Sequence, residues 1–168
     1  MQSNCNIRPA TQADLPTLLE IFDLARAFMR RTGNPNQWAA GYPAPELLLA
    51  EIARGTCYVC EAEGKVQATF CLIPGEDPTY RVIEDGAWPS DAPYSTIHRM
   101  ASRGEVPGMA AACFAWAAAR GGELRADTHA DNKVMQHVLE RAGFVRCGRI
   151  YLANGSPRLA YWRAADPA

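Results

Sequence analysis

The chain has 168 residues, of which 48% are hydrophobic and 21% are charged, as in an ordinary globular domain. Its formal net charge of −1 argues against non-specific nucleic-acid binding, which depends on a basic surface. No apolar run approaches the roughly 20 residues of a membrane span, and no basic segment followed by an apolar core marks a secretory signal. We therefore expect one domain over residues 1–168, in the cytoplasm, without nucleic-acid or membrane partners.

The N-terminal half alternates strands and helices. Residues 5–8 read as a short strand, and apolar side chains at helical spacing predict a helix over residues 14–31. A second helix is predicted over residues 45–54. The strands that follow, 56–62 and 65–73, are joined by a tight turn into a hairpin with a buried face, and residues 79–84 form a short strand-like piece.

Two loops rich in turn-forming residues, 32–43 and 74–93, carry aromatic side chains. Loops carry function more often than cores do, so these side chains are candidates for lining a ligand pocket. The second loop reads as an insertion that covers the same pocket. The alternative is that the aromatic side chains only pin both loops to the surface. The candidate pocket residues are Gln37, Trp38, Tyr42, Tyr80 and Trp88.

Six cysteines lie in apolar contexts. Cys57 and Cys60 have the spacing of a redox or metal-binding pair, but in a strand of period two they point to opposite faces. No second pair follows, so we expect buried free thiols and no metal site. Free thiols of this kind are typical of a reducing cytoplasm.

A strand–loop–helix–strand–helix–strand unit follows, with a loop at 102–108 that leads into an apolar helix. The start of a helix leaves four N–H groups without partners and carries partial positive charge. Gly108 lets the backbone approach a ligand closely, and Arg103 at the loop entrance can meet a phosphate with two hydrogen bonds. The loop therefore suits a pyrophosphate, although an ordinary strand-to-helix turn explains it too. The predicted elements are strands 94–101, 123–128, 145–151 and 158–163 and helices 109–120 and 131–142.

The second helix of this unit has clear boundary signals. Asp131 is a good N-cap residue, and Gly143 is placed to end the helix in the left-handed region. Asn132 then lies in the first turn beside the end of the preceding strand. Its amide either contacts a ligand there or merely supports the cap.

The run Asp131-Asn132-x-x-Met135-x-x-x-Leu139-x-x-x-Gly143-Phe144 resembles the second cofactor motif of the GCN5-related N-acetyltransferase (GNAT) superfamily. The resemblance implies a mixed α/β (α+β) fold, with a mostly antiparallel sheet of about six to seven strands and helices on both faces. It also implies an acyltransferase that moves an acetyl group from acetyl-CoA to a primary amine of a small molecule or protein. The residues placed at the cofactor by this resemblance are Met100, Ala101, Arg103, Val106, Gly108, Met109, Ala110, Asn132 and Met135.

Two positions depart from the family pattern. Glu105 stands where the pyrophosphate loop usually has Gln or Arg, and an acid there is unfavourable unless it points away. Leu139 stands where many members have a tyrosine that protonates the leaving thiolate. Tyr151 and Tyr161 are alternative acids. Because of these departures, a non-catalytic acyl-CoA-binding or sensing module remains the alternative function.

The strand at 94–101 carries a candidate general base, His98, whose imidazole suits proton transfer near neutral pH, although a structural histidine is the alternative. Strand alternation places Ile97, Arg99 and Ala101 on one face, with Asp127 as the expected partner of Arg99. A backbone N–H near Met100 or Ala101 would polarise the carbonyl oxygen of the donor.

Asp127 and His129 follow the next strand and are candidates for contacting the substrate. With Asp131 they match no fixed ligand pattern, so we expect no metal. A nucleotide-binding protein of the doubly wound type is disfavoured, because the strand–Gly-x-Gly-x-x-Gly–helix unit is missing. Exposed strand edges near the C-terminus suggest a homodimer.

Overall fold

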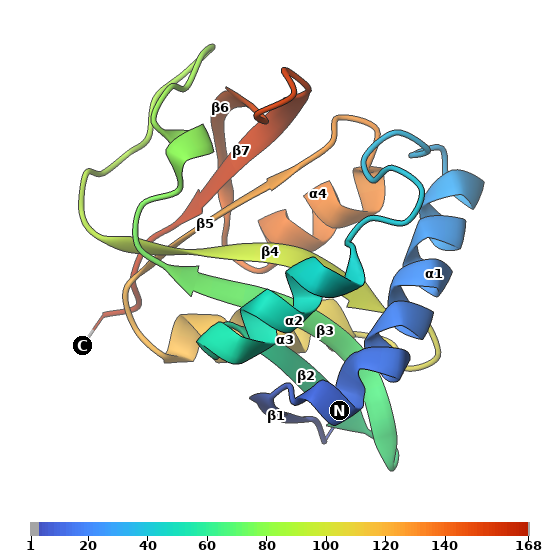
Figure 1. The fold of residues 1–168 in the computed structure, drawn as a ribbon. Helices are drawn as coiled ribbons and strands as arrows, with labels where there is room; N and C mark the ends of the chain where they lie inside the picture. The colour runs from blue at the N-terminus through green and yellow to red at the C-terminus, as the bar shows by residue number, and fades with distance from the viewer. Residues whose placement is uncertain (1–3, 168) are drawn as a thin grey trace.

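The structure, a computed structural model, describes residues 4–167, so residues 1–3 and 168 of the expected domain lie outside it. A seven-stranded sheet is covered by helices on both faces, as predicted (Figure 1). No helix in the described part of the chain is long and apolar enough to cross a membrane. The strands are β1 (Asn6–Pro9), β2 (Cys57–Ala62), β3 (Lys65–Pro74), β4 (Tyr94–Ser102), β5 (Glu123–Thr128), β6 (Val145–Tyr151) and β7 (Pro157–Arg163). The helices are α1 (Leu15–Arg31), α2 (Pro45–Arg54), α3 (Met109–Ala119) and α4 (Lys133–Arg141).

The strand order is β1-β2-β3-β4-β5-β7-β6, and every pair of neighbours is antiparallel except β4 and β5. The mostly antiparallel sheet expected from the sequence is therefore confirmed. The same pattern excludes the doubly wound alternative, whose sheet is mostly parallel.

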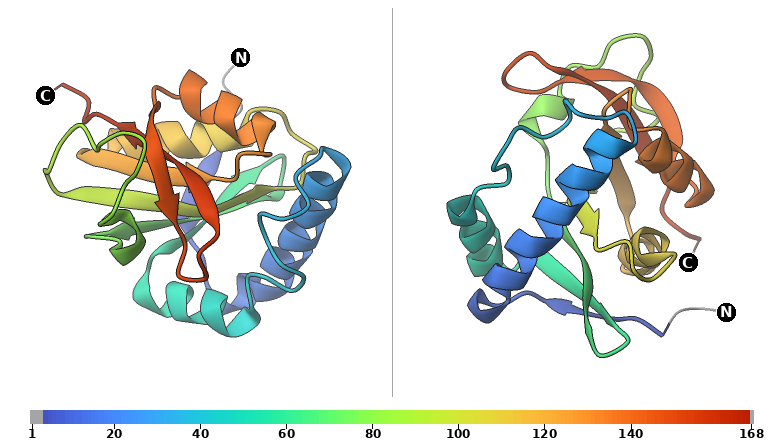
Figure 2. Two further views of the ribbon diagram at one scale, coloured as in Figure 1. Left: turned by 90° about the horizontal axis from the view of Figure 1, so that it is seen from above. Right: turned by 90° about the vertical axis from the view of Figure 1, so that its right-hand side faces the viewer.

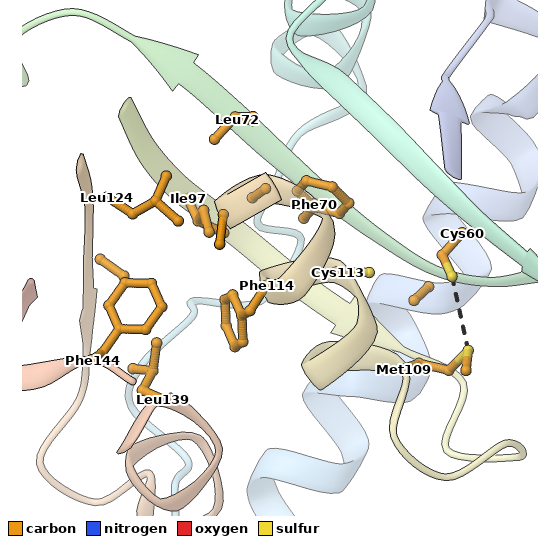
Figure 3. Close-up of a cluster of buried hydrophobic side chains, with 14 of the residues drawn as sticks. Cys60, Phe70, Leu72, Ile97, Met109, Cys113, Phe114, Leu124, Leu139 and Phe144 are labelled. Atoms are coloured by element: carbon orange, nitrogen blue, oxygen red, sulfur yellow. Dashed lines mark hydrogen bonds between the residues drawn. The ribbon is translucent and has the colours of Figure 1, made fainter. Parts of the chain in front are cut away.

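Each face of the sheet has its own core. Helices α1 and α2 cover one face, and α3 and α4 cover the other (Figure 2). Phe114 of α3 and Phe144 after α4 meet at a ring separation of 5.6 Å in the second core, whose side chains are drawn in Figure 3. Cys57 lies in the first core and Cys60 in the second, so the prediction that they face opposite sides is confirmed.

The prediction of free thiols is wrong for one pair. Cys5, which precedes β1, forms a disulfide with Cys60 of β2. Cys57 and Cys71 are buried free thiols. The partner of Cys60 was not visible in the sequence because it depends on β1 lying beside β2. With this disulfide, the cysteine pattern no longer argues for a reducing compartment.

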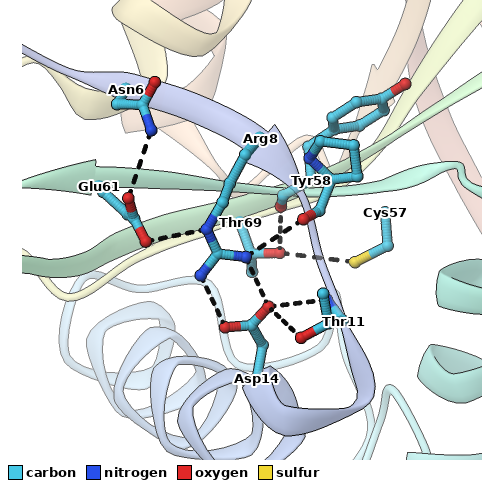
Figure 4. Close-up of polar contacts among 9 residues, drawn as sticks. Asn6, Arg8, Thr11, Asp14, Cys57, Tyr58, Glu61 and Thr69 are labelled. Carbon is cyan, nitrogen blue, oxygen red and sulfur yellow. Dashed lines mark hydrogen bonds and ion pairs between the residues drawn. The ribbon is translucent and has the colours of Figure 1, made fainter.

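Charged side chains fix the corner between β1 and α1 (Figure 4). The Arg8 guanidinium lies between two carboxylates, 2.8 Å from Asp14 and 2.9 Å from Glu61. Its hydrogen bond holds the pKa of Asp14 at about 2, against the opposing effect of burial. Since Asp14 also accepts from the backbone N–H of Thr11 at 2.7 Å, the first turn before α1 is anchored to the sheet.

Strands β4 and β5 are paired only at their beginnings. The pairing covers Tyr94–Thr96 of β4, after which the two strands diverge (Figure 1). A bulge then interrupts β4, because Arg99 and Met100 together lie opposite Phe70 of β3. Arg99 takes a φ of 56°, which is uncommon for a residue other than glycine.

The bulge overturns the predicted alternation along β4. Ile97 belongs to the core under α3 and α4, whereas Ala101 belongs to the core under α1 and α2. The extra residue in the bulge moves the side chains after it to the other face, so Ile97, Arg99 and Ala101 do not share one. The expected partner of Arg99 is also wrong: its Nε donates to the hydroxyl of Tyr42 at 3.0 Å.

The segment 74–93 is held against the sheet rather than lying loosely over it. The predicted strand-like piece at 79–84 is instead a 3₁₀ turn, Pro78–Tyr80, because the Asp77 side chain accepts from the N–H of Thr79 at 2.9 Å and caps it. Further along, the Arg125 guanidinium of β5 lies 4.0 Å from the Trp88 ring centre. Glu84 then pairs with Arg149 of β6 through two backbone hydrogen bonds.

Candidate functional site

Two cavities meet where β4 leaves β5. The larger cavity has a volume of about 540 Å³ and lies among the loop 32–43, the segment 74–93, β4, β5 and the β6–β7 turn. The smaller has about 390 Å³ and lies between α1, the end of β4 and the starts of α3 and α4. Four residues line both cavities, so the two cavities adjoin. The shared residues are Met29, Met100, Asn132 and Met135.

The smaller cavity is an apolar groove with a polar end. Leu24 and Phe28 of α1 are exposed along it, at 41% and 43% of their surfaces. At the other end Gly104 and Gly108 have φ near +80°, and no side chain in the described chain caps the start of α3. The first N–H groups of α3 therefore remain as donors, as the sequence predicted.

Two charged side chains near this groove already have partners within the protein. Arg103 donates to the backbone oxygen of Val66 at 2.7 Å and to Glu20 at 2.8 Å, so its charge is already neutralised. The prediction that Arg103 clamps a phosphate with both arms is not supported by this geometry. Glu105 pairs with Lys65 at 2.6 Å, which lowers its pKa, and it does not line the groove. The unfavourable acid in the loop thus points elsewhere.

Asn132 is fixed at the junction of the cavities. It, and not the predicted Asp131, is the N-cap of α4, since its Oδ1 accepts from the N–H of Met135 at 3.0 Å. Its Nδ2 donates to Oε1 of Gln37 at 2.9 Å, and Asn34 donates to the same oxygen at 2.9 Å. Gln37 therefore ties the loop 32–43 to the start of α4.

A histidine–carboxylate pair lies in the larger cavity. Nε2 of His98 is 2.8 Å from Oδ2 of Asp77. Burial raises the pKa of Asp77, but the hydrogen bonds from His98 and Thr79 outweigh burial and bring that pKa to about 2. The carboxylate is therefore ionised at any ordinary pH. It holds the imidazole with its Nε2–H bonded, which leaves Nδ1 as the basic nitrogen.

Asp127 also lines the larger cavity, and its hydrogen-bond partner was not expected from the sequence. Its Oδ2 accepts from the hydroxyl of Tyr80 at 2.6 Å. Tyr80 is fully buried, and burial raises the pKa of its phenol well above the ordinary value. Tyr80 thus orients Asp127 and does not line the cavity itself.

Other predicted residues divide between lining and supporting positions. Val106 and Met109 point into the core, and Gly108 presents only backbone. Trp88 donates to the backbone oxygen of Tyr80 at 2.8 Å, and His129 accepts from the N–H of Asp131 at 3.0 Å. None of these five lines a cavity. The predicted residues that do are Gln37, Trp38, Tyr42, His98, Met100, Ala101, Arg103, Ala110, Asp127, Asn132 and Met135.

Neither alternative acid is placed to replace the missing tyrosine. Tyr151 donates to Glu84 at 3.0 Å, Tyr161 is buried, and neither lines a cavity. Leu139 itself is buried and lines the larger cavity. Tyr42 is the tyrosine that lines the larger cavity.

Sequence reasoning missed Asp77 and Arg158. Asp77 precedes Pro78-Thr79, a sequence that indicates a capped turn and could have marked its side chain as fixed. Arg158 follows the turn at 154–157 and lines the larger cavity, where it donates to the backbone oxygen of Gln37 at 2.8 Å. No local pattern points to Arg158, because its partner lies 121 positions away.

Replacing Gln37 with leucine should weaken the junction. The substitution keeps the size of the side chain but leaves the amides of Asn34 and Asn132 without their acceptor, which costs about 1–3 kcal/mol of unfolding free energy. Urea unfolding measures this loss. Asn36→Leu is the control, because Asn36 lines the same cavity but is exposed. Equal losses in the two variants would contradict the role assigned to Gln37.

The fold was compared with solved structures. A GNAT-family acetyltransferase from Streptococcus agalactiae 2603 superposes with a TM-score of 0.87 at 30% identity, over 97% of this chain and 96% of that one. A GNAT-family acetyltransferase from Listeria monocytogenes 4b F2365 gives 0.72 at 15% identity, over 98% of each chain. A chain of the NatC complex bound to Gag peptide and CoA gives 0.65 at 12% identity, over 96% of this chain and 99% of that one.

The sequence matches no protein-family model and no curated protein. The relation to the streptococcal protein nevertheless extends over nearly the whole of both chains at 30% identity. The diverging strands, the bulge and the capped helix at Asn132 lie where the sequence resemblance placed the cofactor motifs. The chain belongs to the GNAT family of acetyltransferases.

Proposed function

We propose that this protein transfers the acetyl group of acetyl-CoA to a primary amine, with the donor in the smaller cavity and the amine in the larger. One observation carries the proposal: the two cavities meet at the bulge of β4, at Met100 and Asn132. A donor and an acceptor bound on either side of this point are held in contact. Positioning of this kind supplies much of the rate enhancement in a two-substrate reaction.

The groove fits acetyl-CoA along its length. Beyond Thr96 the edge of β4 that faces β5 has no partner strand, so it can pair with the peptide-like amides of a pantetheine arm. The N–H groups at the start of α3 suit its pyrophosphate. The molecule supplies an activated thioester, and the NatC neighbour, which is bound to CoA, has the same fold. The bulge leaves one residue of β4 out of the regular pairing, and we assign its backbone N–H to the carbonyl oxygen of the donor.

His98 is the proposed general base. An amine attacks only as the free base, so its ammonium proton must be removed, and the Nδ1 of His98 can accept it. Asp77 holds the imidazole in this tautomer and stabilises the imidazolium that forms. Leu139 cannot donate a proton, so we assign no acid and attribute catalysis to positioning and to His98.

The non-catalytic sensing module is the weaker alternative. It depended on Glu105 and Leu139, and Glu105 turns out to pair with Lys65 away from the groove. A sensor has no need for a basic imidazole fixed in the acceptor cavity. Release of CoA thiol in the presence of amines separates the two functions.

A negative charge in the groove should abolish donor binding. Ala110→Asp places a carboxylate in the first turn of α3 inside the groove, where it repels the pyrophosphate but suits the helix dipole. We expect acetyl-CoA affinity to fall at least about 100-fold by titration calorimetry. The matched control is Ala111→Asp, in the same turn but exposed and outside the groove. If both variants bind acetyl-CoA like the wild type, the donor site is wrongly placed.

A further inference from the structure

The larger cavity contains two side chains of opposite charge that have no charged partner. Asp127 is on β5 and Arg158 is on β7, and both line the cavity. Within residues 4–167 neither forms an ion pair. Charges removed from water are costly unless they are paired, so this arrangement calls for a ligand.

The Arg158 side chain is nearly removed from water, with the residue 4% exposed. Its hydrogen bonds go only to neutral oxygens: the backbone of Gln37 at 2.8 Å, the hydroxyl of Ser156 at 2.6 Å and the backbone of Pro157 at 2.8 Å. Burial lowers the pKa of its guanidinium, and the field of Asp127 raises it. A guanidinium held by neutral groups at the wall of a cavity is ready to bind an anion, and a carboxylate matches its geometry.

Asp127 offers the complementary charge. Its one side-chain hydrogen bond within the described chain is from the neutral hydroxyl of Tyr80. In the β5–β7 register Asp127 lies opposite Ala160, so Arg158, two residues along β7, shares its face of the sheet. Such diagonal neighbours are about 7–8 Å apart. The two side chains form no ion pair with each other, so a small molecule can bridge them.

We propose that the acceptor is a free amino acid, whose carboxylate binds Arg158 and whose α-amino group lies between Asp127 and His98. This inference rests on the proposed acetyl transfer and names its substrate class. Asp127 attracts the ammonium form, and Nδ1 of His98 then takes the proton, so that the neutral nitrogen attacks the thioester carbon. The new carbon–nitrogen bond forms as the carbon–sulfur bond breaks. The sulfur leaves with the electron pair as the thiolate, and the excess proton that remains on the nitrogen passes to solvent water, which gives the neutral amide.

The charge arrangement excludes other amines. A diamine would place a second cation beside Arg158, and a peptide N-terminus would offer it only a neutral carbonyl. Either ligand would leave the guanidinium without the charge-assisted hydrogen bonds that a carboxylate would accept from it. Arg158 is therefore the residue expected to set specificity.

The test compares free amino acids with their C-terminal amides, using thiol release from acetyl-CoA. The wild type should prefer the acid by about 100-fold in kcat/KM, mainly through KM. In Arg158→Gln the acid-to-amide ratio should fall to about 1, whereas a merely structural defect lowers both rates together and keeps the ratio. Arg158→Lys should restore part of the preference, because it keeps the charge.

The results distinguish failure of the inferred substrate class from failure of the proposed acetyl transfer. A wild type that acetylates amides or diamines as well as amino acids overturns the inference but leaves the acetyltransferase function intact. A wild type that does not bind acetyl-CoA removes the proposed function itself. If Arg158→Gln does not fold, the ratio measured on the wild type still tests the substrate class.

Discussion

Replacing His98 with glutamine should lower kcat by about 10²–10⁴-fold, the usual contribution of a general base. Glutamine keeps a hydrogen bond to Asp77 but cannot accept a proton from the acceptor amine. The affinity for acetyl-CoA should be unchanged, because His98 lies in the larger cavity only. Steady-state kinetics and titration calorimetry measure the two quantities on the same preparation.

Asp77 does not titrate in the pH range in which the reaction would be measured. Since the pKa of Asp77 lies near 2, below its ordinary value of 3.8, this carboxylate stays ionised throughout the working range. Its contribution to stability is present above 3.8 and lost as the pH falls through about 2. An acid limb in kcat/KM at higher pH therefore does not belong to Asp77.

Asp77→Asn tests the role of the carboxylate. The substitution removes the ionised group that orients the imidazole of His98, so kcat should fall while the affinity for acetyl-CoA is unchanged. A fully active Asp77→Asn variant together with a fully active His98→Gln variant would show that another group, or water, takes the proton.

Local relations in this fold could be read from the sequence. Most helix and strand bounds fall within one or two residues of the predicted ones, as hydrophobic spacing allows. Gly143 ends α4 with a φ of 92°, as its position predicted. The N-cap was misplaced by one residue, at Asp131, because Asp and Asn are equally good caps and stand side by side.

The chemistry of the site depends on contacts that the sequence does not encode locally. His98 and Asp77 are 21 positions apart, and Asn132 and Gln37 are 95 apart. The bulge at Arg99 has no sequence signal either, because a positive φ is rare outside glycine. The motif therefore indicated residues that line the smaller cavity, whereas the larger cavity could be found only in the folded chain.

The segment 74–93 carries Asp77, so its attachment to the sheet matters for the proposed catalysis. Gly86 lies against the backbone of β6, and a Cβ built there would be 1.9 Å from the backbone oxygen of Cys147. Ala87 donates to that same oxygen at 3.1 Å. The atoms nearest to this Cβ all belong to the backbone of β6, so no flexible side chain can move aside and the main chain itself must shift.

Gly86→Ala is therefore expected to cost about 3–4 kcal/mol of unfolding free energy, the sum of steric overlap and backbone strain. The pair between Glu84 and Arg149 should loosen with it, and kcat/KM should fall because Asp77 is no longer held against His98.

Gly75→Ala is the matched control. Its φ of 95° is also positive, but a Cβ there has nothing within 4 Å, so only the strain of about 1–2 kcal/mol remains. Equal losses in urea unfolding would mean that contact with β6 does not hold this wall of the cavity. A larger loss in Gly86→Ala with unchanged kcat/KM would mean that Asp77 keeps its position without that contact.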